Sequence, residues 1–397
     1  MESGDTTTPQ HEGHSGTVYR KRLIVTGVVI LGLAVIVLWA TGLGRQLIQK
    51  ATYAGRPATF SGRSQDLKQT VIVPTRDSPC PPGKNVIWCS SFQLAWNELR
   101  DKVIGAPLQV TGAEEIAARL NAAKQSGSDL EPRSFYATGG WIKDGIIDKI
   151  KKDMAAKFPS HVLADFKGYN DGILTYSYLK ANVPFKYPFR QMDRGLAFTD
   201  SHGVETDVVG FGLWKAFLSQ YKNIREQLEI LSLKSEDPNN PWEPKEYAID
   251  LWRRSKPYQV VVARVELKDS LAETLTYIQR QTEEFKRRSY YEEARRFQAN
   301  DVLEVPEMVW RIDHRFTELI DKPLVNVGMP IVEAMQTIQF RLDRSGAAVE
   351  GEATIAAKAI PREFVFDRPF LIYMQKRGAA QPFFVMWVDN AELLVRR

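Results

Sequence analysis

The C-terminal stretch, residues 339–390, carries the pattern that most constrains the fold of this 397-residue chain. Apolar and polar residues alternate up to Leu342, and small residues then dominate from Gly346 to Ala353. Two apolar runs follow, at 369–373 and 383–388, with a polar turn between them. Such runs are typical of β-strands, and glycine with polar residues marks turns. The sequence therefore predicts a strand, an exposed small-residue segment and two closing strands.

Helical and strand patterns share the rest of the chain. Apolar residues recur every three or four positions in 141–158, which predicts a helix, and one or two helices are expected within 270–297. Residues 172–182 alternate as a strand does. Helices first, strands mixed with helices next and an all-β C-terminus favour the α+β class.

The charges are balanced along the chain. The formal net charge is +5, and the basic run 286–288 is flanked by glutamates at 283–284 and 292–293. Interleaved charge is typical of a solvated helix face, whereas a nucleic-acid-binding surface gathers basic residues. We therefore expect no nucleic-acid partner.

Residues 23–43 form an uncharged run dominated by Val, Ile and Leu. About twenty such residues cross the roughly 30 Å hydrocarbon layer, and the basic cluster 20–22 favours a cytoplasmic N-terminus. A cleaved signal peptide is the competing interpretation, although the run exceeds a signal core and follows a polar tail. We predict a single-pass cell-membrane protein with an extracytoplasmic C-terminal domain. Its expected parts are a cytoplasmic tail at 1–22, a transmembrane helix at 23–43, a juxtamembrane linker at 44–70 and a domain at 71–397.

Two cysteines, Cys80 and Cys89, flank a Pro-Pro-Gly turn. A disulfide between them is chemically permitted outside the cytoplasm and would stabilise the fold by about 2–3 kcal/mol through loop closure. The alternative is that Cys89 is a buried small apolar residue. Both interpretations stay open, because spacing alone does not set the bridge geometry.

Motifs for catalysis and metal binding are absent from the sequence. It contains no Gly-x-x-x-x-Gly-Lys-Ser/Thr, no His-Glu-x-x-His and no Gly-x-Ser-x-Gly. Three histidines follow residue 70, namely His161, His202 and His314, and a solvated or capping role is favoured for each. We expect no enzymatic activity, no cofactor and no metal.

Several segments resemble, in the same order, segments of the serpin family of protease inhibitors. The strongest resemblance is the hinge, exposed loop, Pro-Phe strand and closing strand of residues 340–390. Weaker resemblances are Tyr-Leu-Lys-Ala-Asn…Pro-Phe at 178–189, an apolar strand and a Leu-Ala-Glu-Thr-Leu helix within 258–275, and Val-Pro-Glu-Met-Val-Trp-Arg-Ile at 305–312. The resemblance spans about residues 80–395. It implies a serpin-like α+β fold with a large central β-sheet, smaller sheets and surrounding helices, preceded here by one transmembrane helix.

The resemblance also implies a bait loop at 347–360. Aligning 360–363 on the family's segment after the cleavage point places the bait bond at Lys358-Ala359, with Ala357 or Ala359 as alternative bait residues. A lysine there suits a trypsin-like protease. In the family mechanism the protease acylates at the bait residue and is trapped as the loop inserts into the sheet as a strand. The loop hinge would comprise Gly346, Ala347, Ala348, Val349 and Gly351.

Two features bear on whether insertion is retained. Within 347–354 small or apolar residues occupy one face of an extended strand and both glutamates the other, as insertion requires. Polar groups that gate the sheet in inhibitory serpins are replaced by other residues, at or near Cys89, Phe92, Thr175 and Gln336. The alternative to inhibition is therefore a non-inhibitory serpin-like binding or structural module of the cell envelope, with another envelope protein as its partner.

Overall fold

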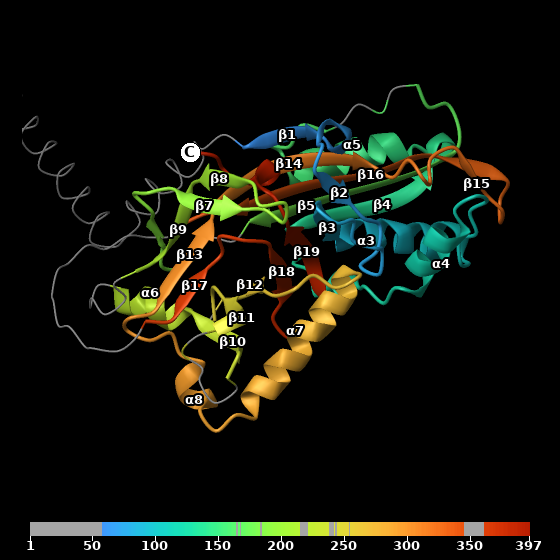
Figure 1. The fold of residues 1–397 in the computed structure, drawn as a ribbon. Helices are drawn as coiled ribbons and strands as arrows, with labels where there is room; N and C mark the ends of the chain where they lie inside the picture. The colour runs from blue at the N-terminus through green and yellow to red at the C-terminus, as the bar shows by residue number, and fades with distance from the viewer. Residues whose placement is uncertain are drawn as a thin grey trace, which may run out of the picture. The chain divides into compact units, whose positions relative to one another are not determined.

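The longest strands of the described residues, β16 and β5, form the centre of one sheet of the computed structural model (Figure 1), which is called the large sheet below. Its strand order is β1-β14-β16-β5-β4, and β15 pairs with β16 off this path. The central pair, β16 and β5, is parallel, whereas β14 and β4 run antiparallel to their inner neighbours. The strands are β1 (Phe60–Arg63), β4 (Phe135–Trp141), β5 (Ile173–Asn182), β14 (Met308–Arg315), β15 (Lys322–Leu324) and β16 (Met329–Leu342).

The structure describes residues 58–163, 166, 168–182, 185–214, 221–237, 242, 244–253, 255–344 and 361–397. The predicted tail at 1–22 and transmembrane helix at 23–43 lie outside these residues. Among the residues described, no helix is both long and apolar enough to cross a membrane.

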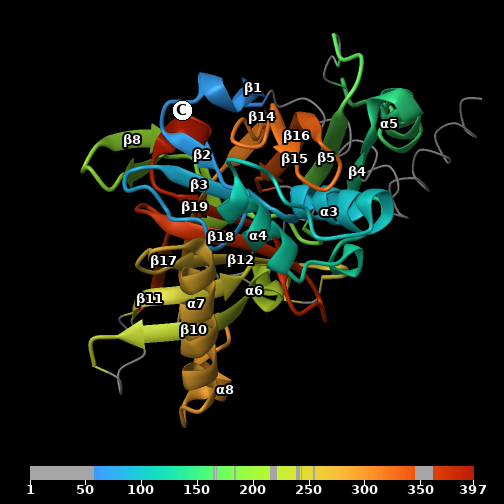
Figure 2. The same ribbon diagram turned by 90° about the vertical axis from the view of Figure 1, so that its right-hand side faces the viewer.

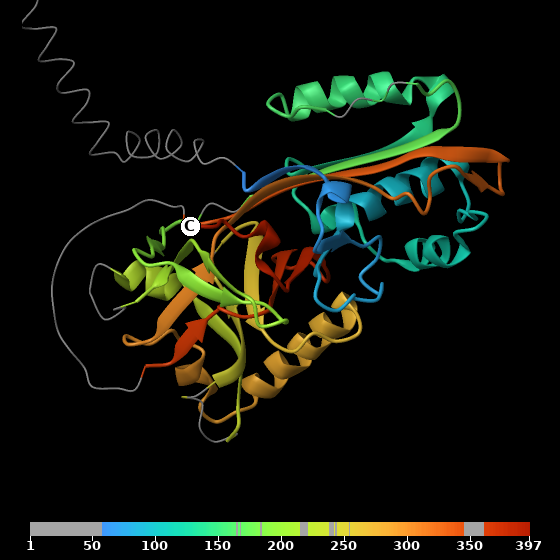
Figure 3. The same ribbon diagram turned by 45° about the horizontal axis from the view of Figure 1, so that its top comes forward.

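Strand β5 is covered on both faces, and its alternating sequence explains why. Ile173 and Leu179 belong to the main core, where α3 (Ser90–Glu98) lies against the sheet. Leu174, Tyr176 and Tyr178 point to the opposite side and pack with α5 (Ile146–Lys157). Figure 3 shows α5 above the large sheet and α3 below it. Successive side chains of a strand point to opposite faces, so one strand contributes to both layers.

A second sheet has the order β10-β11-β12-β18-β19-β3-β2. Helix α7 (Leu271–Lys286) buries Leu271, Leu275 and Ile278 against one of its faces, and the helix crosses the strands in Figure 2. The other face belongs to the main core. The strands are β2 (Thr70–Ile72), β3 (Asn85–Cys89), β10 (Glu229–Ser235), β11 (Pro244–Asp250), β12 (Tyr258–Arg264), β18 (Phe370–Lys376) and β19 (Pro382–Val388).

A small sheet, β17-β13-β9-β6, and a hairpin, β7-β8, complete the β-structure of the described residues. Their bounds are β6 (Arg190–Gln191), β7 (Leu196–Thr199), β8 (Glu205–Val208), β9 (Gly210–Leu213), β13 (Val302–Pro306) and β17 (Glu363–Val365). The other α-helices of the described residues are α4 (Glu114–Ala122), α6 (Lys222–Gln227) and α8 (Tyr291–Ala294). The α+β prediction is confirmed, as are the strand that ends at Leu342 and the two closing strands, β18 and β19, whereas the predicted small-residue segment lies outside the described residues.

The folded domain begins earlier than the prediction of residue 71. Strand β1 pairs in parallel with β14, with Phe60 opposite Trp310, so residues 60–63 form an edge of the large sheet rather than a linker. Further along, Lys68 and Gln69 donate backbone N–H groups to the Glu392 carboxylate. The four residues of β1 alternate too briefly to be recognised as a strand.

Candidate functional site

The predicted bait segment leaves the large sheet at the C-terminal end of β16. There Arg341 Nε donates to Asp343 Oδ2 at 2.7 Å, and the carbonyl of Arg344 accepts from the N–H of Phe189 at 3.0 Å. The chain is thus held as far as residue 344. The predicted bait bond and hinge lie outside the described residues: Gly346, Ala347, Ala348, Val349, Gly351, Lys358 and Ala359.

The seam between β5 and β16 is the structural feature that matters most for a returning strand. The two strands run parallel and pair directly, from Ala334 opposite Thr175 to Arg341 opposite Asn182. A segment that turned back from the end of β16 would run antiparallel to β16 and therefore to β5 as well. The seam is a place where one added strand would form two antiparallel ladders.

A buried polar cluster lies beneath this seam and joins both strands to α3. Gln336 of β16 donates through Nε2 to the Cys89 carbonyl at 3.1 Å and to Ser91 Oγ at 2.9 Å. Ser91, in the first turn of α3, donates in turn to Ser177 Oγ of β5 at 3.3 Å. Ser177 is also the residue opposite Gln336 in the parallel ladder. Separation of β5 from β16 would therefore disturb these hydrogen bonds.

The cluster is only partly satisfied. Gln336 Oε1, Thr175 Oγ1 and Ser90 Oγ are buried and find no hydrogen-bond partner among the residues that the structure describes. A buried polar atom without a partner costs about 1–3 kcal/mol relative to its solvated state. The closed seam is consequently less stable than a fully paired cluster would make it.

The other end of the bait segment enters the domain through Arg362. This residue is 0% exposed, and its Nε donates to Asp301 Oδ1 at 3.0 Å while Nη2 pairs with Asp301 Oδ2. Nη1 donates to the carbonyl of Ala294 and Nη2 also to that of Arg296, both at 2.7 Å. Strand β17 begins at the next residue and pairs in parallel with β13. The distal end is therefore fixed by a desolvated, hydrogen-bonded ion pair.

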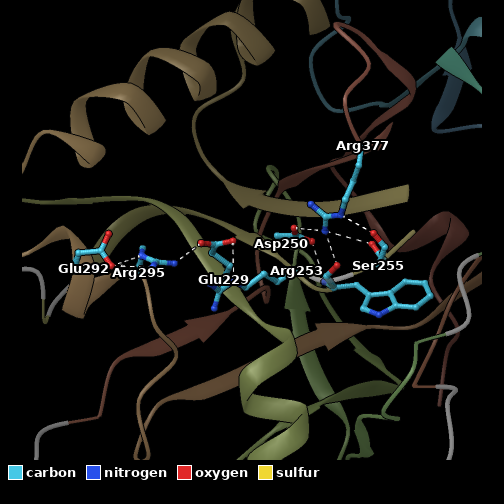
Figure 4. A network of polar contacts seen from close by, with 8 residues as sticks. Glu229, Asp250, Arg253, Ser255, Glu292, Arg295 and Arg377 are labelled. Carbon is cyan, nitrogen blue, oxygen red and sulfur yellow. Dashed lines mark hydrogen bonds and ion pairs between the residues drawn. The ribbon is translucent and has the colours of Figure 1, made fainter. Parts of the chain in front are cut away.

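Charged pairs support the segment that supplies these two carbonyl groups (Figure 4). Arg295 lies between them in sequence and pairs with Glu292 at 2.8 Å and with Glu229 of β10 at 2.9 Å. Glu229 also pairs with Arg253 at 3.4 Å. The carbonyl groups on either side of Arg295 are thus held in place by the ion pairs of its side chain with α8 and β10.

Figure 4 also shows Asp250, a buried residue at the end of β11, whose carboxylate pairs with Arg377 at 2.8 Å. Burial raises the pKa of this carboxyl, and the Arg377 guanidinium opposes that shift. Arg377 Nε also donates to the Ser255 carbonyl at 2.8 Å. The turn between β18 and β19 is thereby tied to the connection between β11 and β12 of the same sheet.

Comparisons with known proteins concern the fold alone. No protein-family model matches the chain, and no curated protein matches it. Similar solved structures include native protease nexin-1 with heparin (10% identity, TM-score 0.46), the thermophilic serpin tengpin in its native state (13%, 0.38) and Manduca sexta serine protease inhibitor (serpin) 12 (12%, 0.44). They cover 77%, 62% and 77% of this chain and 92%, 63% and 92% of the matched chains. Likenesses this loose assign no function.

The gating positions chosen from the sequence fall partly within the polar cluster. Gln336 is its central donor, and Cys89 contributes a carbonyl and a thiol 3.2 Å from Ser91 Oγ. Phe92 instead packs on Phe316, with 3.9 Å between ring centroids. Sequence reasoning missed Ser91 and Ser177. The alternation of β5 could have revealed Ser177, because it shares a face with Thr175.

The candidate disulfide is not formed. Both cysteines are free thiols, and they belong to different apolar clusters: Cys89 to the main core and Cys80 to the cluster under α7. Burial raises the pKa of the Cys89 thiol to about 12 and that of Cys80 to about 11. The interpretation of Cys89 as a buried small residue is the one confirmed.

Two of the three histidines are partly buried rather than solvated. His161 Nε2 is hydrogen-bonded to the Tyr176 hydroxyl at 3.2 Å, and its ring lies tilted against that of Tyr178, with 4.4 Å between centroids. His314 contacts Ser64 Oγ through Nδ1 at 2.7 Å. Burial lowers the pKa of each to about 4. Among the described residues, no three His, Cys, Asp or Glu side chains gather as metal ligands.

Proposed function

We propose that this chain is a membrane-anchored, serpin-like protein whose segment 347–360 is bait for an extracytoplasmic protease. The observation that carries the proposal is the placement of this segment between β16 and β17. It follows β16, which pairs in parallel with β5, and precedes β17, which is fixed by Arg362 and pairs with β13. Both ends of the segment are therefore attached to strands of the domain. The transmembrane helix at 23–43 would place this domain outside the cytoplasm.

The bait bond is Lys358-Ala359, and a trypsin-like protease is the expected target. The protease nucleophile attacks the Lys358 carbonyl, an acyl bond to the protease forms, and the Ala359 amine departs with the transferred proton. The freed segment then inserts between β5 and β16 with the protease still attached. Insertion replaces one parallel ladder by two antiparallel ladders, and antiparallel pairing is slightly more stable per residue. The side-chain alternation of 347–354 supports this step, since it separates the small residues from both glutamates.

A non-inhibitory binding or structural module of the cell envelope is the second candidate. Gln336 favours it, because its amide joins β16 to the start of α3 where it also reaches the Ser91–Ser177 pair. A seam held closed by these bonds would leave the segment as a cleavable or protein-binding loop without insertion.

Incubation of the full-length protein with trypsin, followed by denaturing electrophoresis and thermal unfolding, separates the two candidates. The inhibitor gives an SDS-stable adduct, a C-terminal fragment beginning at Ala359 and a higher melting temperature of the cleaved protein. Lys358→Ala abolishes the adduct, whereas Glu352→Ala, a matched change in the same segment, retains it. Cleavage without an adduct and without thermal stabilisation would leave the binding module as the function.

A further inference from the structure

We propose that Asp301 determines where a protease cuts this chain, by hiding Arg362. Residues 345–362 contain two basic residues, Lys358 and Arg362. A protease that cleaves after lysine or arginine has two candidate bonds, four positions apart. The inference rests on the proposed function and deepens it, because a bait works only if cleavage falls at the bond whose acyl group is carried by the inserting segment.

The side chain of Arg362 is withdrawn from any specificity pocket. Its guanidinium engages the Asp301 carboxylate and the carbonyl groups of Ala294 and Arg296. The ring of Trp242 lies 5.3 Å from its central carbon, and that of Phe364 lies 5.5 Å away. A protease that cleaves after lysine or arginine must insert the side chain before the scissile bond into its own acidic pocket. The guanidinium of Arg362 is instead paired with Asp301 of this chain.

The backbone of Arg362 is equally engaged. Its carbonyl, the group that a protease would attack, accepts from the N–H of Val302 at 2.9 Å. Its own N–H faces Asp301 Oδ1 at 3.3 Å. The second carboxylate oxygen of Asp301 also accepts from the Gln298 N–H at 2.6 Å, which fixes the carboxylate itself. Cleavage at Arg362 therefore requires opening of both the ion pair and the strand that follows.

The arrangement selects arginine rather than lysine at this position. Three of the nitrogen atoms of the planar guanidinium donate to three different acceptor residues, which a single ammonium group on a flexible stem does not reproduce. Removal of the Asp301 charge leaves the cation buried without its counter-ion, which destabilises the closed arrangement and favours its opening. Hydrolysis could then add water across either peptide bond, after Lys358 or after Arg362.

The test maps cleavage sites in the native full-length protein by the mass of the C-terminal fragment. With limiting trypsin, the wild type should yield the fragment that begins at Ala359, and the fragment that begins at Glu363 should form at least about a hundredfold more slowly, as expected for a site that requires opening of a buried ion pair. In Asp301→Asn both fragments should appear at comparable rates. The double variant Asp301→Asn/Arg362→Gln should lose only the shorter fragment.

Glu304→Gln is the matched control, because Glu304 lies in the neighbouring β13 and pairs with Arg194 instead of Arg362. It should retain the wild-type cleavage pattern. If Asp301→Asn does not fold, Arg362→Lys serves instead, since it keeps a cleavable residue and loses the planar fork. Ready wild-type cleavage after Arg362, or a folded Asp301→Asn protein still protected there, would overturn the inference. A wild type that is cut at Lys358 without forming an adduct would refute the proposed inhibitory mechanism but not the role of Asp301.

Discussion

The seam beneath the start of the bait segment and the anchor at its end are stabilised in different ways. At the anchor, Arg362 and Asp301 are saturated by each other, by two carbonyl groups and by backbone N–H groups. At the seam, the hydrogen bonds of Gln336, Ser91 and Ser177 coexist with buried atoms that have no partner in the described part of the chain. A buried polar network in which every group is hydrogen-bonded makes the structure rigid, whereas a network with unpaired groups makes the closed arrangement less stable.

This difference matches what an inserting strand needs. The seam must open without the loss of much stability, so a few unpaired polar atoms there reduce the free energy that opening costs. The distal end must stay with β13 while the rest of the segment moves, and a buried ion pair resists that separation. Of the three predictions below, which start with the largest expected effect, the first and the last test the contrast and the second tests the large sheet around the seam.

Loss of the anchor charge should destabilise the fold most. Arg362→Met removes the guanidinium and leaves the Asp301 carboxylate buried without a cation, which we expect to lower the free energy of unfolding by about 3–5 kcal/mol. Urea unfolding monitored by tryptophan fluorescence measures this change.

Arg63→Met is the control for that substitution. Arg63 pairs with Asp66 at 3.6 Å, and both side chains are exposed, by 68% and 49%. Exposed pairs contribute about 1 kcal/mol or less, so this variant should remain close to the wild type. Equal losses in the two variants would mean that the anchor is no stronger than a surface ion pair.

Much of the fold could be predicted from the sequence, whereas the anchor could not. The alternation of residues 172–182 located β5, and the apolar runs near the C-terminus located β18 and β19, because these signals are local. Arg362 meets Asp301, which lies 61 positions earlier, and a charged residue next to a predicted exposed loop gives no local sign of burial. Ser91 and Ser177 are likewise 86 positions apart, so their contact exists only in the folded chain.

Acid should weaken the large sheet through His314 of β14. Its folded pKa is about 4 because the ring is buried, against 6.5 for the ordinary imidazole. Between these values the unfolded chain binds a proton that the folded chain does not. Stability is therefore complete above about pH 6.5 and falls as the pH drops toward 4, by up to about 1.4 kcal/mol per pH unit.

His314→Gln removes this titration, so its deficit relative to the wild type should shrink between pH 6.5 and pH 5 in urea unfolding experiments. His161→Gln should shift in the same direction, because the pKa of His161 is also lowered to about 4. If the wild type and His314→Gln lose stability in parallel, the buried imidazole of β14 does not titrate with unfolding.

A pair of threonines in the large sheet isolates the effect of an unpaired atom at the seam. Thr175 and Thr337 are 1% and 0% exposed, but only the Thr337 hydroxyl donates, to Asp313 Oδ1 at 2.7 Å. Thr175→Val removes a hydroxyl without a partner among the described residues, so it should stabilise the protein by about 1 kcal/mol and slow hydrogen exchange in β5. Thr337→Val should destabilise it by about 1–2 kcal/mol. If Thr175→Val is as damaging as Thr337→Val, the seam is fully satisfied and its contrast with the Arg362 anchor disappears.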